Sequence, residues 1–261
     1  MKIKEFIRPD SLQQANELLS SEGAAIVGGG AFMHLNDIEI TKAIDLHYLG
    51  LDYIKESNEL IEIGAMTTLR ELEISNLTKQ YFNGILSKAA ASIMGVQVRN
   101  IATVGGSIYN KYGFSDILTA MLTLNAQVEL YNAGLMSLES YIESSLDKDI
   151  LLKIIINKSV SKASFECFKK TRSDFSVLNV AAAIVKGKLR ICVGARPARA
   201  RVAKGAMSFL NIIDSTNTAA EMAGILAAEE MQFGSDIRAS EEYRKELCHT
   251  LVKRCVLEVL Q

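Results

Sequence analysis

The sequence predicts an α+β fold, and the patterns of the N-terminal and C-terminal parts of the chain support this prediction. The N-terminal part, up to about residue 157, mixes short apolar strands with helices of ordinary length. The remainder reads as a small antiparallel sheet with a tight hairpin turn at Lys186-Gly187-Lys188, followed by three helical stretches. Strands gathered in one region and helices in the next are typical of this class.

Capping residues predict the helices of the N-terminal part. Ser11 is placed to cap a helix with apolar residues at helical spacing, and Gly23 is placed to end it. Thr67-Thr68, followed by Glu71, lies near the capping-box arrangement at the start of another helix. Apolar spacing predicts further helices at 85–94 and 115–124, and C-terminal helices at about 203–210, 219–229 and 240–260.

Apolar runs and alternation predict the strands. Ala24 to Val27 is a short apolar run that fits a buried strand, and Glu59 to Gly64 alternates polar and apolar residues. Similar patterns predict strands at 43–46, 49–54, 128–130, 135–138, 154–156, 163–168, 177–185 and 189–193. We place a domain boundary between residues 157 and 158, because the segment N-K-S-V-S-K at 157–162 is polar and has no periodicity.

The composition excludes several classes of protein. The chain has 261 residues, 49% hydrophobic and 23% charged, which is typical of a globular protein with one large or two modest domains. A net charge of -1 gives no sign of a nucleic-acid partner or a basic membrane patch. The N-terminus lacks the apolar core of a signal peptide, and no apolar run is long enough for a membrane helix. We therefore expect a cytoplasmic protein.

The cysteines and histidines do not predict a metal site. Cys167, Cys192, Cys248 and Cys255 include no pair with the C-x-x-C spacing of zinc or iron–sulfur ligands. We expect them to be reduced and largely buried thiols. The three histidines are scattered along the chain and form no ligand set.

Two glycine-rich stretches are the candidate binding loops. Gly28-Gly29-Gly30 follows a predicted strand, and Gly105-Gly106 lies in the polar stretch Val98 to Asp116, which we expect to be a loop. Successive glycines let backbone N–H groups turn toward one anion with no Cβ in the way. Neither stretch has the Rossmann or the P-loop spacing. The residues alone therefore leave two interpretations, tight turns between packed strands or a clamp around a nucleotide-type cofactor.

No catalytic residue is assigned. The chain has no H-E-x-x-H motif and no suggestive Ser-His-Asp set, and its paired acids lie on helices that we expect to be exposed. An enzyme with no acid, base or metal of its own takes its chemistry from a cofactor.

Several motifs in order resemble the FAD-binding subunit of molybdenum hydroxylases, the family of xanthine dehydrogenase and carbon monoxide dehydrogenase flavoproteins. The resemblance runs nearly end to end. It rests on A-I-V-G-G-G-A-F-M from Ala25, L-I-E-I-G-A-M-T-T-L-R-E-L from Leu60, V-R-N-I-A-T-V-G-G-S-I-Y-N from Val98, and S-D-I-R-A-S-E-E-Y-R-K-E-L from Ser235.

This resemblance implies a two-lobed FAD-binding (PCMH-type) fold over residues 1–157, with lobes at about 1–55 and 56–157. Residues 158–261 would form the flavoprotein C-terminal domain. FAD would lie between the lobes. No motif of the family fixes the residue that faces the flavin ring, and we take Phe175, in R-S-D-F, as the candidate. The first loop would bind the pyrophosphate through Val27, Gly28, Gly29, Gly30, Ala31, Phe32, Met33, His34 and Leu35. The second would contribute Thr103, Gly105, Gly106, Ser107, Asn110 and Asp116.

The implied function is an FAD-dependent electron-transfer subunit with no metal of its own. Electrons would come from [2Fe–2S] clusters on a small partner subunit and pass through FAD to NAD+ or another acceptor. Hydroxylation would take place on a large molybdopterin-binding subunit. Two alternatives stay open: an assembly subunit that kept the fold but binds FAD weakly or not at all, and a stand-alone flavin oxidoreductase.

Overall fold

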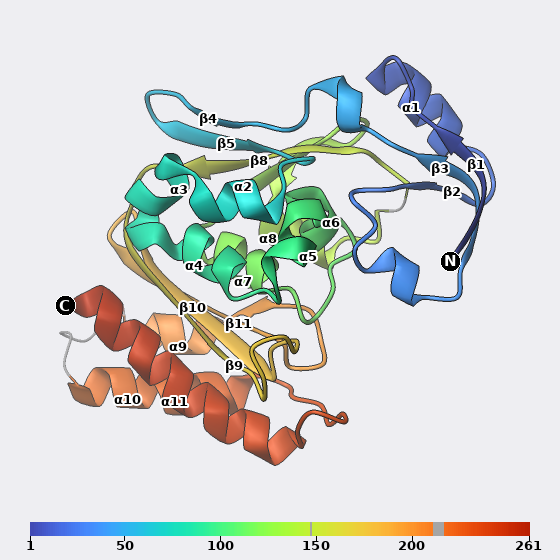
Figure 1. The fold of residues 1–261 in the computed structure, drawn as a ribbon. Coiled ribbons are helices and arrows are strands. Elements are labelled where there is room, and N and C mark those ends of the chain that lie inside the picture. Colours follow the sequence, from blue (N-terminus) through green and yellow to red (C-terminus); the bar gives the residue numbers. More distant parts are fainter. Residues whose placement is uncertain (147, 211–216) are drawn as a thin grey trace.

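A computed structural model of the protein describes residues 1–146, 148–210 and 217–261 and contains three β-sheets that follow one another along the chain (Figure 1). The first has three parallel strands, and the second and third have five and four antiparallel strands. Helices cover the second and third sheets, which confirms the predicted α+β class.

The first lobe is built on the three-stranded sheet, in the order β1-β3-β2. Its strands are β1 (Lys2–Ile7), β2 (Ala24–Ile26) and β3 (Glu39–Ile44), with α1 (Leu12–Leu19) between β1 and β2. Ser11 caps α1 as predicted, accepting a hydrogen bond from the N–H of Gln14 at 3.1 Å. Strand β1 was not predicted, because five of its six residues are exposed and only pairing with β3 defines it.

The second lobe contains the five-stranded sheet, in the order β4-β5-β8-β6-β7. The strands are β4 (Ile54–Glu56), β5 (Leu60–Gly64), β6 (Gln127–Leu130), β7 (Gly134–Ser137) and β8 (Leu151–Asn157). The helices are α2 (Leu69–Ile74), α3 (Asn76–Gln80), α4 (Ile85–Ala91), α5 (Val96–Ile101), α6 (Val104–Tyr109), α7 (Asp116–Thr123) and α8 (Leu138–Glu143). The strand predicted at 49–54 is wrong, since a 3₁₀ turn at His47–Leu49 interrupts it and β4 begins at Ile54.

The C-terminal sheet has the order β12-β11-β10-β9 and is covered on both faces. Its elements are β9 (Val160–Phe168), β10 (Leu178–Val185), β11 (Lys188–Gly194) and β12 (Arg201–Val202), followed by α9 (Lys204–Leu210), α10 (Asn217–Glu230) and α11 (Glu241–Leu260). Val180 and Ile191 face α10 and α11, whereas Ala181 and Cys192 join the core of the second lobe. The hydrophobic core therefore continues from the second lobe into this sheet.

The stretch Val98 to Asp116 was predicted as a loop, and this prediction is wrong. It contains the end of α5, all of α6 and the start of α7. Gly105 lies inside α6, where a Cβ would come within 2.7 Å of the Ala65 carbonyl oxygen. Here glycine permits a close contact between a helix and the sheet, and no turn is required.

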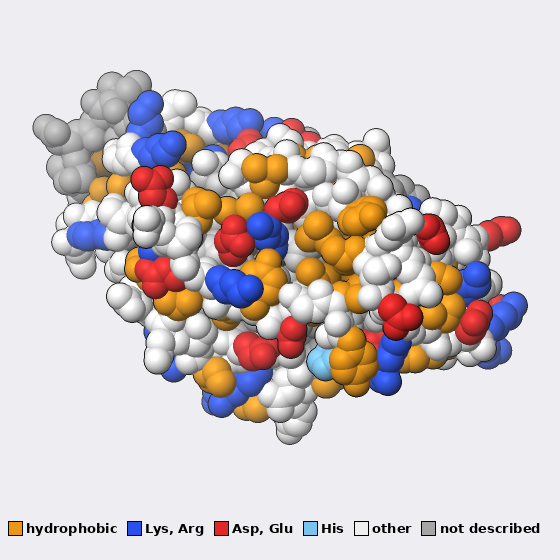
Figure 2. Space-filling model, turned by 90° about the horizontal axis from the view of Figure 1, so that it is seen from above, with side chains coloured by type: hydrophobic (Ala, Val, Ile, Leu, Met, Phe, Trp, Pro, Cys, Tyr) orange, Lys and Arg blue, Asp and Glu red, His pale blue; other side chains and the backbone are white. Residues whose placement is uncertain are grey.

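The remaining expectations concern thiols and surface charge. Cys192, Cys248 and Cys255 are buried, and burial raises the pKa of Cys192 to about 11 and that of Cys248 to about 12, so both stay protonated. On the face shown in Figure 2, positive and negative side chains are interspersed, and neither forms a continuous field. Across the described ranges, no helix combines the length and the apolar character needed to span a membrane.

Candidate functional site

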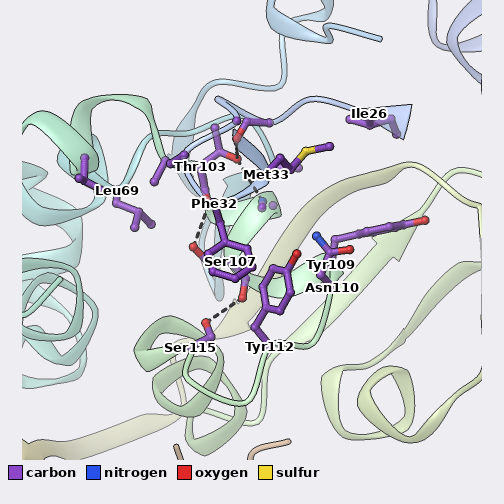
Figure 3. A pocket seen from close by; sticks show the side chains of 18 of the residues that line it. Ile26, Phe32, Met33, Leu69, Thr103, Ser107, Tyr109, Asn110, Tyr112 and Ser115 are labelled. Carbon is purple, nitrogen blue, oxygen red and sulfur yellow. Dashed lines mark hydrogen bonds between the residues drawn. The ribbon is translucent and has the colours of Figure 1, made fainter. Parts of the chain in front are cut away.

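A cavity of about 620 Å³ lies where the two lobes and the C-terminal sheet meet (Figure 3). Its volume falls within the range of small-molecule and cofactor sites. The first lobe contributes the segment after β2, the second contributes α6 and the segment after it, and the C-terminal part contributes Lys169, Asp174 and Phe175. All three parts of the fold therefore contribute to the lining of the cavity.

The segment after β2 is held in an unusual backbone conformation. The N–H of Val27 still pairs with Ile44 of β3, at 2.9 Å, and the chain then turns through Gly29 and Gly30, whose φ angles are +74° and +67°. A Cβ on Gly29 would lie 1.6 Å from the carbonyl oxygen of Ile101. Glycine at this position lets the first lobe rest directly on the end of α5.

This turn leaves a row of backbone donors without a partner, and five of its six residues, Gly28 and Gly30 to Met33, line the cavity. Among the described residues, the six N–H groups from Gly28 to Met33 have no hydrogen-bond acceptor in the protein. The next N–H, that of His34, donates to Gly30 at 3.2 Å and closes the row. Unpaired backbone N–H groups need an external acceptor. A row of such groups on a segment that lines a cavity suits an anion such as a phosphate group.

Thr103 joins the two glycine-rich segments. It is the N-cap of α6: its Oγ1 accepts a hydrogen bond from the N–H of Gly106 at 3.1 Å and donates one to the carbonyl oxygen of Gly28 at 3.2 Å. Ser107 donates to the Thr103 carbonyl at 3.0 Å, and Ser115 donates to the Ser107 carbonyl at 2.7 Å. The hydroxyls visible in Figure 3 thus hold the second segment in shape.

Replacing Thr103 with valine tests this link. Thr103→Val keeps the side-chain shape but removes both hydrogen bonds, so we expect a loss of about 1–2 kcal/mol in unfolding free energy. We also expect weaker ligand binding in the cavity, because the Gly28 segment loses its tether. Thr78→Val is the matched control: Thr78 is buried and donates to Leu72 and Ser75, away from the cavity. Denaturant unfolding measures the stability of each variant, and ligand titration measures its affinity. Equal ligand affinity in Thr103→Val and Thr78→Val would contradict the role of Thr103 as the link between the two segments.

Four aromatic rings line one wall of the cavity and come from all three parts of the fold. Phe32 lies 4.7 Å from Tyr112 and 5.0 Å from Phe114, measured between ring centroids. Phe114 lies 4.3 Å from Phe175 of the C-terminal part. We call these four residues the aromatic cluster. It gives the cavity an apolar surface suited to a planar ring system.

Asp116 forms a buried polar network beside the cavity. Its carboxylate, 2% exposed, accepts hydrogen bonds from Ser176 and Asn179, both at 2.6 Å. It also accepts one from Ser92 and one from Lys169, both at 3.0 Å. A carboxylate has about four acceptor positions, so the protein itself fills them. The same network holds Lys169 beside Asp116 at the cavity wall.

The structure brings most of the predicted site residues together. Those that line the cavity are Gly28, Gly30, Ala31, Phe32, Met33, His34, Leu35, Thr103, Gly105, Gly106, Ser107, Asn110, Asp116 and Phe175. Val27 and Gly29 do not line it: Val27 continues the sheet, and Gly29 faces α5.

Sequence reasoning missed several residues of the walls. Tyr112, Ser115, Lys169 and Asp174 line the cavity, as does Ile93 just after α4. Asp174 is adjacent to the predicted Phe175, so its place at the cavity could have been predicted from the sequence. That of Lys169 could not, because only the packing of the C-terminal sheet brings it to Asp116.

Two family profiles match consecutive parts of the chain. The sequence profile described as the FAD binding domain in molybdopterin dehydrogenase matches residues 1–158. The profile described as the CO dehydrogenase flavoprotein C-terminal domain matches residues 163–259. Together they span nearly the whole chain.

Similar proteins and structures agree with these profiles. The nicotine 6-hydroxylase medium subunit of Paenarthrobacter nicotinovorans is 25% identical, over 97% of this chain and 96% of its own. The xanthine dehydrogenase FAD-binding subunit of Escherichia coli O157:H7 is 24% identical, over 94% and 91%. A solved structure of carbon monoxide dehydrogenase from Hydrogenophaga pseudoflava matches with a TM-score of 0.91 at 22% identity, covering 99% of this chain and 97% of that one. At this identity the structural likeness concerns the fold.

Proposed function

Because the chain belongs to the family of FAD-binding domains of molybdopterin dehydrogenases, we propose that it is the FAD-carrying subunit of a molybdenum hydroxylase complex. The observation that best supports the proposal is the row of six unpaired N–H groups from Gly28 to Met33, beside a cavity of about 620 Å³. Members of this family are oxidoreductase subunits, which agrees with a chain that has no evident acid–base or metal chemistry of its own.

The residues of the cavity fit FAD in three respects. The row of backbone donors suits a pyrophosphate. Tight packing at Gly28, where a Cβ would lie 2.7 Å from the Thr103 hydroxyl, leaves no room for a side chain between the two segments. The aromatic cluster offers a surface for a planar ring. We propose that the cavity-lining residues named above hold FAD, with Phe175 facing the flavin.

We further propose a division of labour among subunits. When bound, FAD supplies the redox chemistry that connects electrons from [2Fe–2S] clusters of a small partner chain to the reduction of NAD+ or another acceptor. The substrate is hydroxylated on a large molybdopterin-binding partner. This chain binds and orients the cofactor and encloses it at the junction of its lobes. Within the described residues, no group of three or more His, Cys, Asp or Glu side chains is placed to hold a metal ion.

A direct experiment is to purify the chain from its native source and record its visible absorption and its FAD content. We expect about one FAD per chain, together with a molybdopterin-binding chain and an iron–sulfur chain. Added FAD should lose fluorescence on binding, and the variant Thr103→Val should bind it more weakly. A colourless chain that does not bind added FAD would contradict the proposal.

One observation favours a second candidate, an assembly subunit with weak FAD binding. The charged residues lining the cavity, within the described part of the chain, are Asp116, Lys148, Lys169 and Asp174. Lys169 is already paired with Asp116, and Lys148 donates to the carbonyl oxygen of Ser21 at 3.2 Å. The pyrophosphate would then depend mainly on neutral backbone donors. This candidate predicts that the partners co-purify with much less than one flavin per chain.

A further inference from the structure

The segment between α10 and α11 forms a rigid turn next to the cavity wall. The N–H of Asp236 donates to Ala239 at 3.0 Å, and the Asp236 carboxylate accepts from the N–H groups of Arg238 and Ala239 at 2.7 and 3.2 Å. In Figure 1 this segment lies at the same end of the C-terminal sheet as the connection between β9 and β10, which carries Asp174 and Phe175.

Arg244, near the start of α11, bonds to this turn through its side chain. Its guanidinium is 1% exposed and donates to the carbonyl oxygens of Gly234 and Ala239 at 2.5 and 2.7 Å. It also donates to the Asp236 carboxylate at 2.6 Å and to the carbonyl oxygen of Val177 at 2.9 Å. One buried side chain thus links several residues of the turn to one another and joins the turn to the residue before β10.

Arg238 extends from this turn to the cavity wall. Its Cζ lies 5.3 Å from the centroid of the Phe175 ring, and its Nε donates to Asp174 at 3.2 Å. The same Asp174 oxygen accepts from the N–H of Phe175 at 2.8 Å. Phe175 lines the cavity and contacts Phe114 of the aromatic cluster, whereas Arg238 is not among the lining residues. Arg238 therefore contacts two C-terminal residues that line the cavity without lining it itself.

We propose that Arg238, held in place by Arg244, is a positioning residue that sets the orientation of Phe175 and Asp174 at the cavity wall. The inference deepens the proposed function and rests on it, since the wall in question would border FAD. A planar guanidinium can stack on a ring and bind a carboxylate at the same time, which a lysine ammonium cannot do equally well. The arrangement therefore favours arginine over lysine at this position.

The first test needs no cofactor. The chain contains no tryptophan, so Phe175→Trp introduces a single fluorescent reporter at the wall. We expect Arg238→Gln in this background to move the emission to longer wavelength and to make it more accessible to acrylamide, with Arg238→Lys intermediate. Lys245→Gln is the matched control, because Lys245 pairs with Glu229 at 2.8 Å on exposed side chains and is not among the residues lining the cavity. Unchanged emission with Arg238→Gln, or an equal shift with Lys245→Gln, would overturn the inference.

The second test uses FAD and the unlabelled chain. We expect Arg238→Gln to raise the Kd for FAD by about 3- to 30-fold and to change the absorption spectrum of the bound flavin. Arg238→Lys should partly restore both, and Lys245→Gln should leave both at the wild-type value. Equal Kd and spectrum in wild type and Arg238→Gln would overturn the positioning role. A wild-type chain that binds no FAD would instead contradict the proposed function, while the tryptophan reporter would still decide whether Arg238 orients the wall.

Discussion

Gly29→Ala is expected to abolish FAD retention. A Cβ at this position would lie 1.6 Å from the Ile101 carbonyl oxygen, and the φ of +74° already disfavours any L side chain. Because the obstacle is backbone, no side-chain rotation relieves it, and the segment must move away from α5. That movement would displace the six N–H groups beside it. We expect FAD content after purification to fall to a few per cent of wild type, measured by absorbance after release of the flavin.

Alanine variants at two other glycines distinguish the effect of the steric clash from the effect of the backbone conformation. Gly30 has nearly the same φ, +67°, but a Cβ there would meet only Val27 Cγ1, at an ordinary 3.6 Å. Gly134, in the turn between β6 and β7, has a φ of +69° and no atom within 4 Å. Both alanine variants should lose about 1 kcal/mol of unfolding free energy from the left-handed conformation. Retention of FAD in Gly29→Ala, or its loss in Gly30→Ala to the same degree, would argue against the role assigned to this contact.

Arg244→Met should cause the largest loss of stability. Methionine retains much of the apolar contact but removes the Arg244 donor from the carbonyl oxygens of Val177 and Gly234, and leaves Ala239 with only the N–H of Asp236. Asp236 loses its buried partner as well. Removing one member of a buried charge network costs about 3–5 kcal/mol. Urea unfolding at neutral pH, followed by far-UV circular dichroism, measures this directly.

Arg254→Met is the matched control on the same helix. Arg254 is exposed, so its replacement should change the unfolding free energy by less than about 0.5 kcal/mol. A loss of similar size in the two variants would show that the buried contacts of Arg244 do not stabilise the fold.

The same contact predicts a pH dependence. Burial raises the pKa of Asp236, but the hydrogen bonds from Arg244 and from the N–H groups of Arg238 and Ala239 outweigh it, so the pKa lies below its usual value of 3.8. A carboxyl whose pKa is lower in the folded state contributes stability above its unfolded pKa, and this contribution is lost as pH falls through the folded value. The stability difference between wild type and Arg244→Met should therefore shrink below about pH 4. A difference that stays constant from neutral pH to pH 3 would contradict this.

The fold was largely predictable because its signals are local. Ser11 and Thr68 cap their helices through hydrogen bonds to residues three positions along, and the hairpin turn at Lys186-Gly187 joins β10 and β11 in register. Strand β1 was missed because nothing in its own sequence reports the pairing with β3. The stretch around Gly105 was mistaken for a loop because glycine lowers helix propensity, while the contact with Ala65 that requires it lies 40 residues away.

By itself, the sequence determined the class of the fold, the two glycine-rich segments and the family to which they belong. These three conclusions depend on the spacing of residues that are close together in the sequence. The tertiary structure decided what each segment does. Gly29 packs against the end of α5, Thr103 bonds to Gly28, Lys169 pairs with Asp116, and Arg238 packs over the Phe175 ring. Each of these contacts joins residues more than 50 positions apart, and only the packing of the three sheets brings them together.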